Sequence, residues 1–169
     1  MSEPPMTAWL ELAATRVELR ALVDEYAARA DARDYHGLSE LFEPDGYVCS
    51  SNPGELTPFF EARGRAELAG LLRGNDQFVS TFHFVGNHQC RVEGTTASGV
   101  TYCSARHLQD WGSETRALVM HIRYHDGYRR TDGEWRFTTR RIEMVWVEYA
   151  DADSSPYPFR EGSSAWMDS

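Results

Sequence analysis

The stretch WLELAATRVELRALVDEYAARADARD, residues 9–34, decides the fold. It contains no glycine or proline and is rich in alanine, leucine, glutamate and arginine, so it predicts one long helix. Apolar residues recur along it at spacings of three and four, which defines the face that packs against the rest of the chain: Leu12, Leu19, Leu22, Val23, Tyr26, Ala27 and Ala30. Asp31 lies on this face, four residues after Ala27. A carboxylate on a buried face is costly unless a partner binds it, which makes Asp31 the first candidate functional residue.

The chain after this helix predicts short helices followed by long strands. Residues 35–42 and 65–72 are expected to be helical, with a short strand at 47–50 between them. From residue 78 onward, turn residues separate five strands, which we place at 78–85, 89–93, 99–109, 116–129 and 135–149. Helices followed by an antiparallel meander indicate an α+β fold. Because strands this long twist and curl, we expect a curved antiparallel sheet wrapped on the N-terminal helices, forming a cone with an internal pocket.

The length of 169 residues predicts a single domain, which we place at residues 1–149, with residues 1–7 as a loose leader. Residues 150–169 are rich in Asp, Ser, Pro and Gly, so they predict a weakly ordered tail. The aromatic residues of this tail would serve as a flap over the pocket or as a contact to a partner subunit.

The charge balance excludes some classes of partner. Lys plus Arg is 17 and Asp plus Glu is 26, a net charge of −9, which disfavours nucleic acid and anionic membranes. The sequence predicts neither a secretory signal nor a stretch of about 20 apolar residues that could span a bilayer. Cys49, Cys90 and Cys103 fit neither a disulfide framework nor a zinc motif. We therefore expect a cytoplasmic protein with reduced thiols.

Two histidines on predicted strands are the natural partners of Asp31. His83 lies on a strand with two largely apolar faces, and His107 shares its face with small residues, as where a strand lines a cavity. Alone, each histidine is more typical of a satisfied core residue. An aspartate that accepts from one imidazole nitrogen fixes the tautomer and leaves the other nitrogen free as a base. We therefore predict Asp31, His83 and His107 as a catalytic acid/base centre. The same trio would suit zinc or iron, but we expect neither a metal nor a cofactor.

Other side chains are predicted to surround a substrate. Alternation along residues 116–129 places Met120, Ile122 and Tyr124 on one face, where they would form an apolar wall. Either Arg140 or Arg141 could hold a substrate anion. We interpret Arg140 as a solvated charge on its strand and retain Arg141 as the candidate.

Five segments resemble the SnoaL-like, nuclear-transport-factor-2-like superfamily: YAARADARDY (26–35), LFEPD (41–45), TFHFVGN (81–87), DGEWRF (132–137) and RRIEMVW (140–146). The resemblance implies a cystatin-like α+β barrel. It is nearest to the branch that contains scytalone dehydratase and hexachlorocyclohexane dehydrochlorinase, both cofactor-free lyases with an Asp/His centre. It implies catalytic roles for Asp31, His83 and His107, a homo-oligomer (a trimer rather than a dimer), and a C-terminal segment that helps to close the pocket.

The chain also departs from this branch. Ala30 stands where scytalone dehydratase has a tyrosine, and a second site tyrosine falls near Ser50. Ile122 and Tyr124 replace a serine and an asparagine. The acid/base core is therefore kept while the groups that hold the substrate differ, so scytalone is not the expected substrate.

These observations predict a lyase of the dehydratase or dehydrohalogenase type that acts on an apolar cyclic small molecule. His83 would be the base, oriented by Asp31, and His107 would donate to the leaving group or hold the substrate. Two alternatives stay open: a cyclase, epoxide-opening enzyme or isomerase that uses the same dyad, and a non-catalytic small-molecule-binding module. The predicted substrate-binding residues are Tyr26, Tyr47, Met120, Ile122, Tyr124, Arg141 and Trp146.

Overall fold

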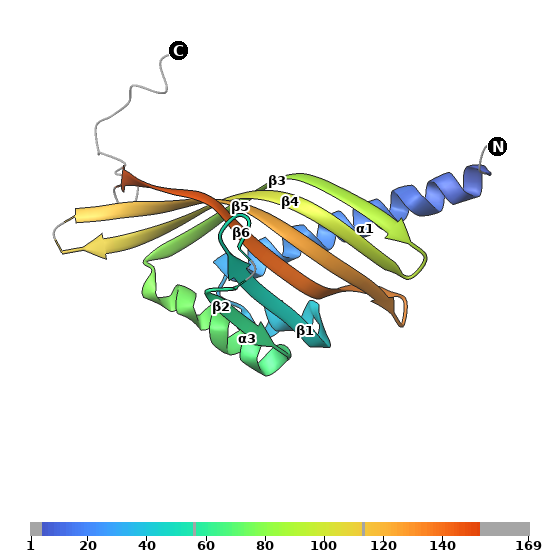
Figure 1. The fold of residues 1–169 in the computed structure, drawn as a ribbon, viewed down its shortest axis with the longest axis horizontal. Coiled ribbons are helices and arrows are strands. Elements are labelled where there is room, and N and C mark those ends of the chain that lie inside the picture. Colours follow the sequence, from blue (N-terminus) through green and yellow to red (C-terminus); the bar gives the residue numbers. More distant parts are fainter. Residues whose placement is uncertain (1–4, 56, 113, 153–169) are drawn as a thin grey trace, which may run out of the picture.

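The computed structural model describes residues 5–152, except residues 56 and 113. The helices are α1 (Met6–Asp31), α2 (Tyr35–Glu40), α3 (Arg65–Leu72) and the short 3-10 helix η1 (Arg73–Gln77). The strands are β1 (Phe42–Ser51), β2 (Phe60–Arg63), β3 (Ser80–Glu93), β4 (Thr96–Trp111), β5 (Glu114–Thr131) and β6 (Glu134–Ala152) (Figure 1). Helices thus come first and the long strands follow, as the sequence predicted.

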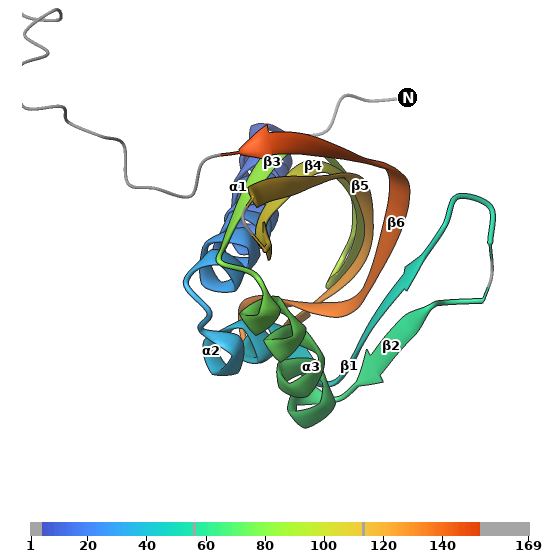
Figure 2. The ribbon, with the colours of Figure 1, turned by 90° about the vertical axis from the view of Figure 1, so that its left-hand side faces the viewer.

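The strands form one six-stranded sheet in the order β2-β1-β6-β5-β4-β3. The pairs are antiparallel except for β1 and β6, which run parallel. Figure 2 shows the sheet curling from β3 round to β6, with α1, α2 and α3 along its open side. The predicted α+β fold with a curved sheet on the N-terminal helices is confirmed, with one parallel pair that the sequence did not predict.

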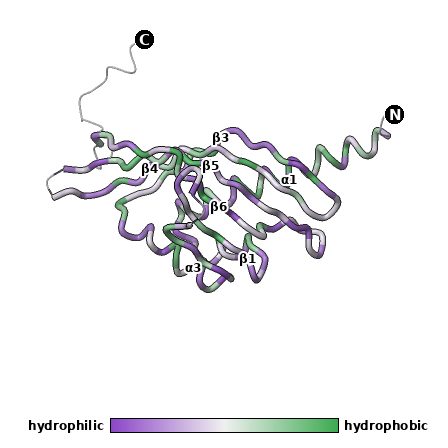
Figure 3. Tube along the Cα trace, in the orientation of Figure 1, coloured by the Kyte–Doolittle hydropathy of each residue, from purple (hydrophilic) through white to green (hydrophobic). Residues whose placement is uncertain are grey.

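Helix α1 is the element that carries the candidate acid, and it differs from its predicted bounds at both ends. It begins at Met6 after Pro5, so residues 6 and 7 do not belong to a loose leader. It ends at Asp31, not at residue 34, because Arg33 adopts a left-handed backbone conformation with φ 58° that cannot continue a helix. Hydrophobic and hydrophilic residues alternate along it (Figure 3), as expected of a helix with one buried face.

Four further differences concern the strands. The second helix was predicted to end at residue 42 but ends at Glu40, because β1 already begins at Phe42. Strand β2 was not predicted. The strands expected at 78–85 and 89–93 are one strand, β3, with an irregularity between Val85 and His88. Residues 150–152 belong to β6 and not to a tail, whereas the predicted flap at 153–169 lies outside the described residues.

The core lies between the concave side of the sheet and the helices. Its fully buried members come from α1, α2, β1, α3, β5 and β6: Leu19, Val23, Leu38, Phe42, Val48, Leu68, Tyr128 and Phe137. Within residues 5–152, apart from 56 and 113, no helix is both long and apolar enough to cross a membrane.

The convex side of the sheet exposes aromatic side chains: Phe82, Phe84, Tyr102 and Trp146 are each at least 50% accessible. Three of them, Phe84, Tyr102 and Trp146, line one shallow groove across β3 to β6. Patches of this kind are typical of contact surfaces between proteins. The homo-oligomer that the resemblance implies stays a prediction.

Candidate active site

Asp31 meets β3 at the point where α1 ends. Its Oδ1 lies 2.6 Å from Nδ1 of His83 and accepts a hydrogen bond from the Thr81 hydroxyl at 2.9 Å. Its Oδ2 accepts a hydrogen bond from the backbone N–H of His83 at 2.9 Å. Thr81 and His83 can both reach it because they lie two residues apart and so share one face of the strand. The carboxylate on the buried face of α1 therefore has partners, and one of them is a predicted histidine.

These contacts set the charge of the acid. Burial raises the pKa of Asp31, but the hydrogen bonds from His83 and Thr81 outweigh burial, so that the net pKa lies below its usual value. Asp31 is thus a carboxylate at neutral pH. A carboxylate facing Nδ1 favours the tautomer in which Nδ1 carries the proton and Nε2 the lone pair. The described residues form no hydrogen bond to Nε2, which leaves this nitrogen of His83 free to act as a base.

An apolar cavity of about 330 Å³ opens beside this pair. Its volume lies at the lower end of the range for ligand pockets, about 300–1,000 Å³, so one or two rings would fill it. It is lined by Tyr26, Val48, Phe60, Leu71, Leu72, Gly74, Asn75, Gln77, Phe78, His83, His107, Met120, Ile122, Tyr124, Ile142 and Met144. No lysine or arginine is among these residues, so the cavity presents no cation to a ligand apart from a protonated imidazole.

His107 reaches the same cavity from β4. Its ring lies 5.4 Å from the ring of His83 and 4.3 Å from that of Phe78, and the residue is 5% exposed. Neither Nδ1 nor Nε2 has a hydrogen-bond partner among the described residues. Buried imidazoles are normally hydrogen-bonded, so a bare one in a cavity indicates a site where a ligand or water completes the bonding. The structure therefore brings Asp31, His83 and His107 together, as predicted.

Burial, with a smaller contribution from His83, lowers the pKa of His107 to about 4. The ring is therefore neutral at neutral pH and offers one donor and one acceptor. Its desolvation is not offset by a carboxylate in contact with the ring.

This neutral state predicts a pH-dependent stability. A histidine of the unfolded chain has a pKa near 6.5, so between pH 6.5 and 4 the unfolded chain binds a proton that the folded protein excludes. Stability is then lost as the pH falls through this window, by about 2 kcal/mol at pH 4.5. Urea unfolding at pH 7 and pH 4.5 should show a steeper loss for the wild type than for His107→Gln. Parallel losses in the two proteins would contradict a buried neutral His107.

Four predicted substrate-binding residues line the cavity, namely Tyr26, Met120, Ile122 and Tyr124. Tyr47, Arg141 and Trp146 do not, so their predicted position is wrong. Tyr47 lies on the face of β1 opposite to Val48, where its hydroxyl donates to Glu61 and Arg63 lies over its ring.

Arg141 and Trp146 both lie on β6, where two irregularities reverse which side chains face inward. Thr138 has no partner on β5, and neither does Val145. Arg141 lines a separate shallow pocket, and Trp146 stacks on His121 on the convex face, with ring centroids 4.2 Å apart.

Arg140 corrects a further prediction, because it is fully buried and not a solvated charge. Its Nε and Nη2 each donate to the Asp126 carboxylate at 2.8 Å. The guanidinium also lies 4.0 to 4.3 Å from the ring centroids of Tyr26, Tyr124 and Phe137. Since Tyr26 and Tyr124 line the cavity, this ion pair supports one of its walls from behind.

Sequence reasoning missed the segment that covers the cavity, at the end of α3 and along η1: Leu71, Leu72, Gly74, Asn75, Gln77 and Phe78. It also missed Ile142 and Met144, although their period-two spacing on β6 was a signal that could have found them. Nothing in the local sequence of Thr81 indicates its hydrogen bond to Asp31 of α1.

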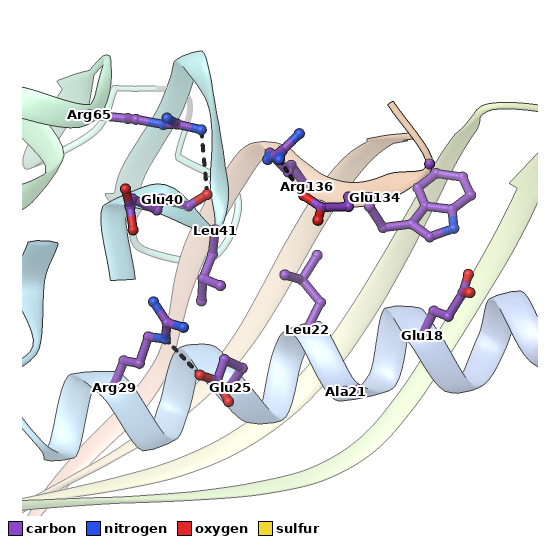
Figure 4. A pocket seen from close by; sticks show the side chains of 12 residues that line it. Glu18, Ala21, Leu22, Glu25, Arg29, Glu40, Leu41, Arg65, Glu134 and Arg136 are labelled. Carbon is purple, nitrogen blue, oxygen red and sulfur yellow. Dashed lines mark hydrogen bonds and ion pairs between the residues drawn. The ribbon is translucent and has the colours of Figure 1, made fainter. Parts of the chain in front are cut away.

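A larger and more open groove, of about 730 Å³, lies outside the cone between α1, α2 and the start of β6 (Figure 4). Its charges are of mixed sign and several are paired: Arg29 Nε lies 2.7 Å from Glu25, and Arg136 pairs with Glu134. Arg65 donates to backbone carbonyls. Because both arginine–glutamate pairs and Arg65 are already bound within the protein, the smaller cavity with the unpartnered imidazole of His107 is the stronger candidate site. In the described part of the chain, no cluster of three His, Cys, Asp or Glu side chains could hold a metal ion.

Comparisons with known proteins show the family and the fold. The family model described as a SnoaL-like domain matches residues 11–141. A scytalone dehydratase-like protein of Claviceps purpurea is 22% identical over 139 residues, 77% of this chain and 87% of that protein.

Two solved structures share the fold. An NTF2-like protein with a cystatin-like fold from Novosphingobium aromaticivorans has a TM-score of 0.64 at 28% identity, covering 85% of this chain and 92% of that one. A hexachlorocyclohexane dehydrochlorinase from Novosphingobium barchaimii has a TM-score of 0.73 at 16% identity, covering 88% and 99%. At that identity the second likeness concerns the fold alone.

Proposed function

The chain belongs to the SnoaL-like domain family, and from this premise we propose that it is a cofactor-free lyase of the dehydratase or dehydrohalogenase type. One observation carries the proposal: a carboxylate-oriented imidazole and a buried imidazole without hydrogen-bond partners face the same apolar cavity. The resemblance to a scytalone dehydratase-like protein supports the same class.

In this proposal His83 is the base. Its Nε2 removes a proton from a carbon next to an activating group, and Asp31 stabilises the imidazolium that forms at a distance of 2.6 Å from Nδ1. The electron pair of the broken C–H bond forms the new double bond, and the leaving group departs with its own pair. A halide leaves as the anion, whereas hydroxide needs a proton to leave as water.

His107 holds the leaving group in this scheme but does not protonate it. With a pKa of about 4, His107 carries no extra proton at neutral pH, so its N–H gives a hydrogen bond only. The proton that completes a water molecule then comes from the His83 imidazolium, whose ring centroid is 5.4 Å from that of His107. One ligand can contact both rings at this distance.

The cavity also supports a proposal for the substrate class. Its walls are apolar, its volume is about 330 Å³ and its lining carries no arginine, features that suit a small, uncharged cyclic molecule. The chain contains no lysine, which excludes a Schiff base to a lysine side chain.

A panel of uncharged cyclic β-hydroxyketones and cyclic halides tests the proposal. The wild-type protein should convert the hydroxyketones to conjugated enones with loss of water, followed by ultraviolet absorbance, and the halides to alkenes, followed by halide release. Asp31→Asn should bind the same compounds, measured by calorimetry, with turnover lowered by about a hundredfold or more. Compounds that bind without any product would favour the non-catalytic binding module instead.

A further inference from the structure

The Thr81 hydroxyl donates a hydrogen bond to the Asp31 carboxylate, and the proposed mechanism gives this hydroxyl no role. Of the three donors to this carboxylate, two belong to His83, namely its ring Nδ1 and its backbone N–H. The third is the Thr81 hydroxyl, at 2.9 Å from Oδ1, the same oxygen that faces the imidazole. Thr81 is 8% exposed, so water does not readily replace this donor.

The geometry makes the Thr81 hydroxyl different from the imidazole with which it shares Oδ1. Asp31 is the last residue of α1, so no following helical turn packs against its side chain. The ring of His83 can rotate about its own bonds and lose the contact with Oδ1. The backbone N–H of His83 does not move with the ring, but it binds Oδ2. The hydroxyl of Thr81, two residues away on β3, is therefore the one donor to Oδ1 that does not depend on the position of the imidazole.

We infer that Thr81 is a positioning residue: its hydroxyl fixes the orientation of the Asp31 carboxylate, which in turn keeps the proton of His83 on Nδ1 and the lone pair on Nε2. The inference rests on the proposed function insofar as it treats Nε2 as the base. Its structural content, the fixed carboxylate and tautomer, can be measured in the absence of any substrate.

The second donor on Oδ1 also bears on the acidity of Asp31. Burial raises the pKa of Asp31, and the bonds from His83 and Thr81 lower it. The other ionisable groups that influence this region are His107 and Cys103, both on β4. None of these groups changes when Thr81 is replaced, so a shift in the titration of Asp31 reports the lost hydroxyl.

Three variants test the inference. Thr81→Val removes the hydroxyl while it keeps the shape and the β-branch, and Thr81→Ser keeps the hydroxyl. Thr101→Val is the matched control, because Thr101 is a fully buried threonine on the neighbouring strand whose hydroxyl has no partner among the described residues. Circular dichroism confirms that each variant is folded before it is used.

Two NMR measurements on the substrate-free protein give the answer. Long-range ¹H–¹⁵N spectra of the histidine rings should show the Nδ1–H tautomer of His83 in the wild type and a mixture of tautomers in Thr81→Val. The carboxyl ¹³C titration should place the pKa of Asp31 higher by about half a unit to one unit in Thr81→Val. Thr81→Ser and Thr101→Val should both match the wild type. A wild-type tautomer and an unchanged Asp31 titration in Thr81→Val would overturn the inference, as would equal shifts in Thr101→Val.

Turnover distinguishes this inference from the proposed function. With a substrate from the panel, Thr81→Val should lower kcat about tenfold with KM unchanged, and Thr81→Ser should restore it. Absence of turnover in the wild type would overturn the proposed lyase while the spectra still decide the role of Thr81. A raised KM with unchanged kcat would contradict a role in orienting the base.

Discussion

His83→Ala should lower the turnover of any substrate found for this protein by about a hundredfold to ten-thousandfold, the usual contribution of a general base. The reason is geometric: in the described structure, His83 is the one side chain that both lines the cavity and contacts a carboxylate, at 2.6 Å from Asp31. Steady-state kinetics on the compound identified in the panel would measure kcat and KM separately. We expect the loss in kcat, because the alanine variant leaves the apolar walls that bind the substrate unchanged.

His88→Ala is the matched control for this variant. His88 lies on the same strand and is also half-buried, but its ring faces Tyr128, with Nε2 3.4 Å from the Tyr128 hydroxyl, and it does not line the cavity. Its replacement should leave kcat close to that of the wild type. If both variants lose activity equally, the effect comes from a perturbed β3, and the assignment of His83 as the base fails.

Asp126→Leu should lower the free energy of unfolding by about 3–5 kcal/mol, the cost of leaving one partner of a buried ion pair uncompensated. Both side chains of the Arg140–Asp126 pair are inaccessible to solvent, and two hydrogen bonds of 2.8 Å join them. Without the carboxylate, the guanidinium contacts only the faces of three aromatic rings. These cation–π contacts offset a small part of the free energy of hydration that the buried charge has lost. Urea unfolding of the variant and the wild type, at the same pH, measures the difference.

The double variant Asp126→Leu, Arg140→Met distinguishes the cost of an unpaired buried charge from the cost of altered packing. Replacing both partners by apolar groups of similar size should recover most of the lost stability, since no buried charge is then left alone. The exposed pair Arg91–Glu93 supplies the control, and Glu93→Gln should leave the unfolding curve almost unchanged. A single variant as stable as the wild type would mean that water reaches Arg140 and that the pair is not buried in solution.

The buried ion pair also shows where prediction from sequence failed. Alternation along β6 starting from the inward-facing Phe137 places Arg141, four residues on, inside the cone. Thr138 has no partner on β5, so the alternation of inward-facing and outward-facing side chains shifts by one residue. Arg140 therefore faces inward in place of Arg141. The unpaired Val145 shifts the alternation a second time. Met144 faces the cavity, and Trp146, two residues later, therefore faces outward. A single unpaired residue reverses every later side chain of a strand, and no local pattern of the sequence reveals it.

The sequence by itself determined that helices come first and long strands follow, that Asp31 lies on the buried face of α1, and that His83 and His107 lie on strands. These features depend on helical and strand periodicity, which are local properties of the chain. Only the tertiary structure decided which side chains meet: Thr81 with Asp31, Asp126 with Arg140, and the α3–η1 segment with the rim of the cavity. Such contacts join residues far apart in the chain, and they depend on strand register and on the point where a helix ends. Neither is specified by the residues on one side of the contact alone.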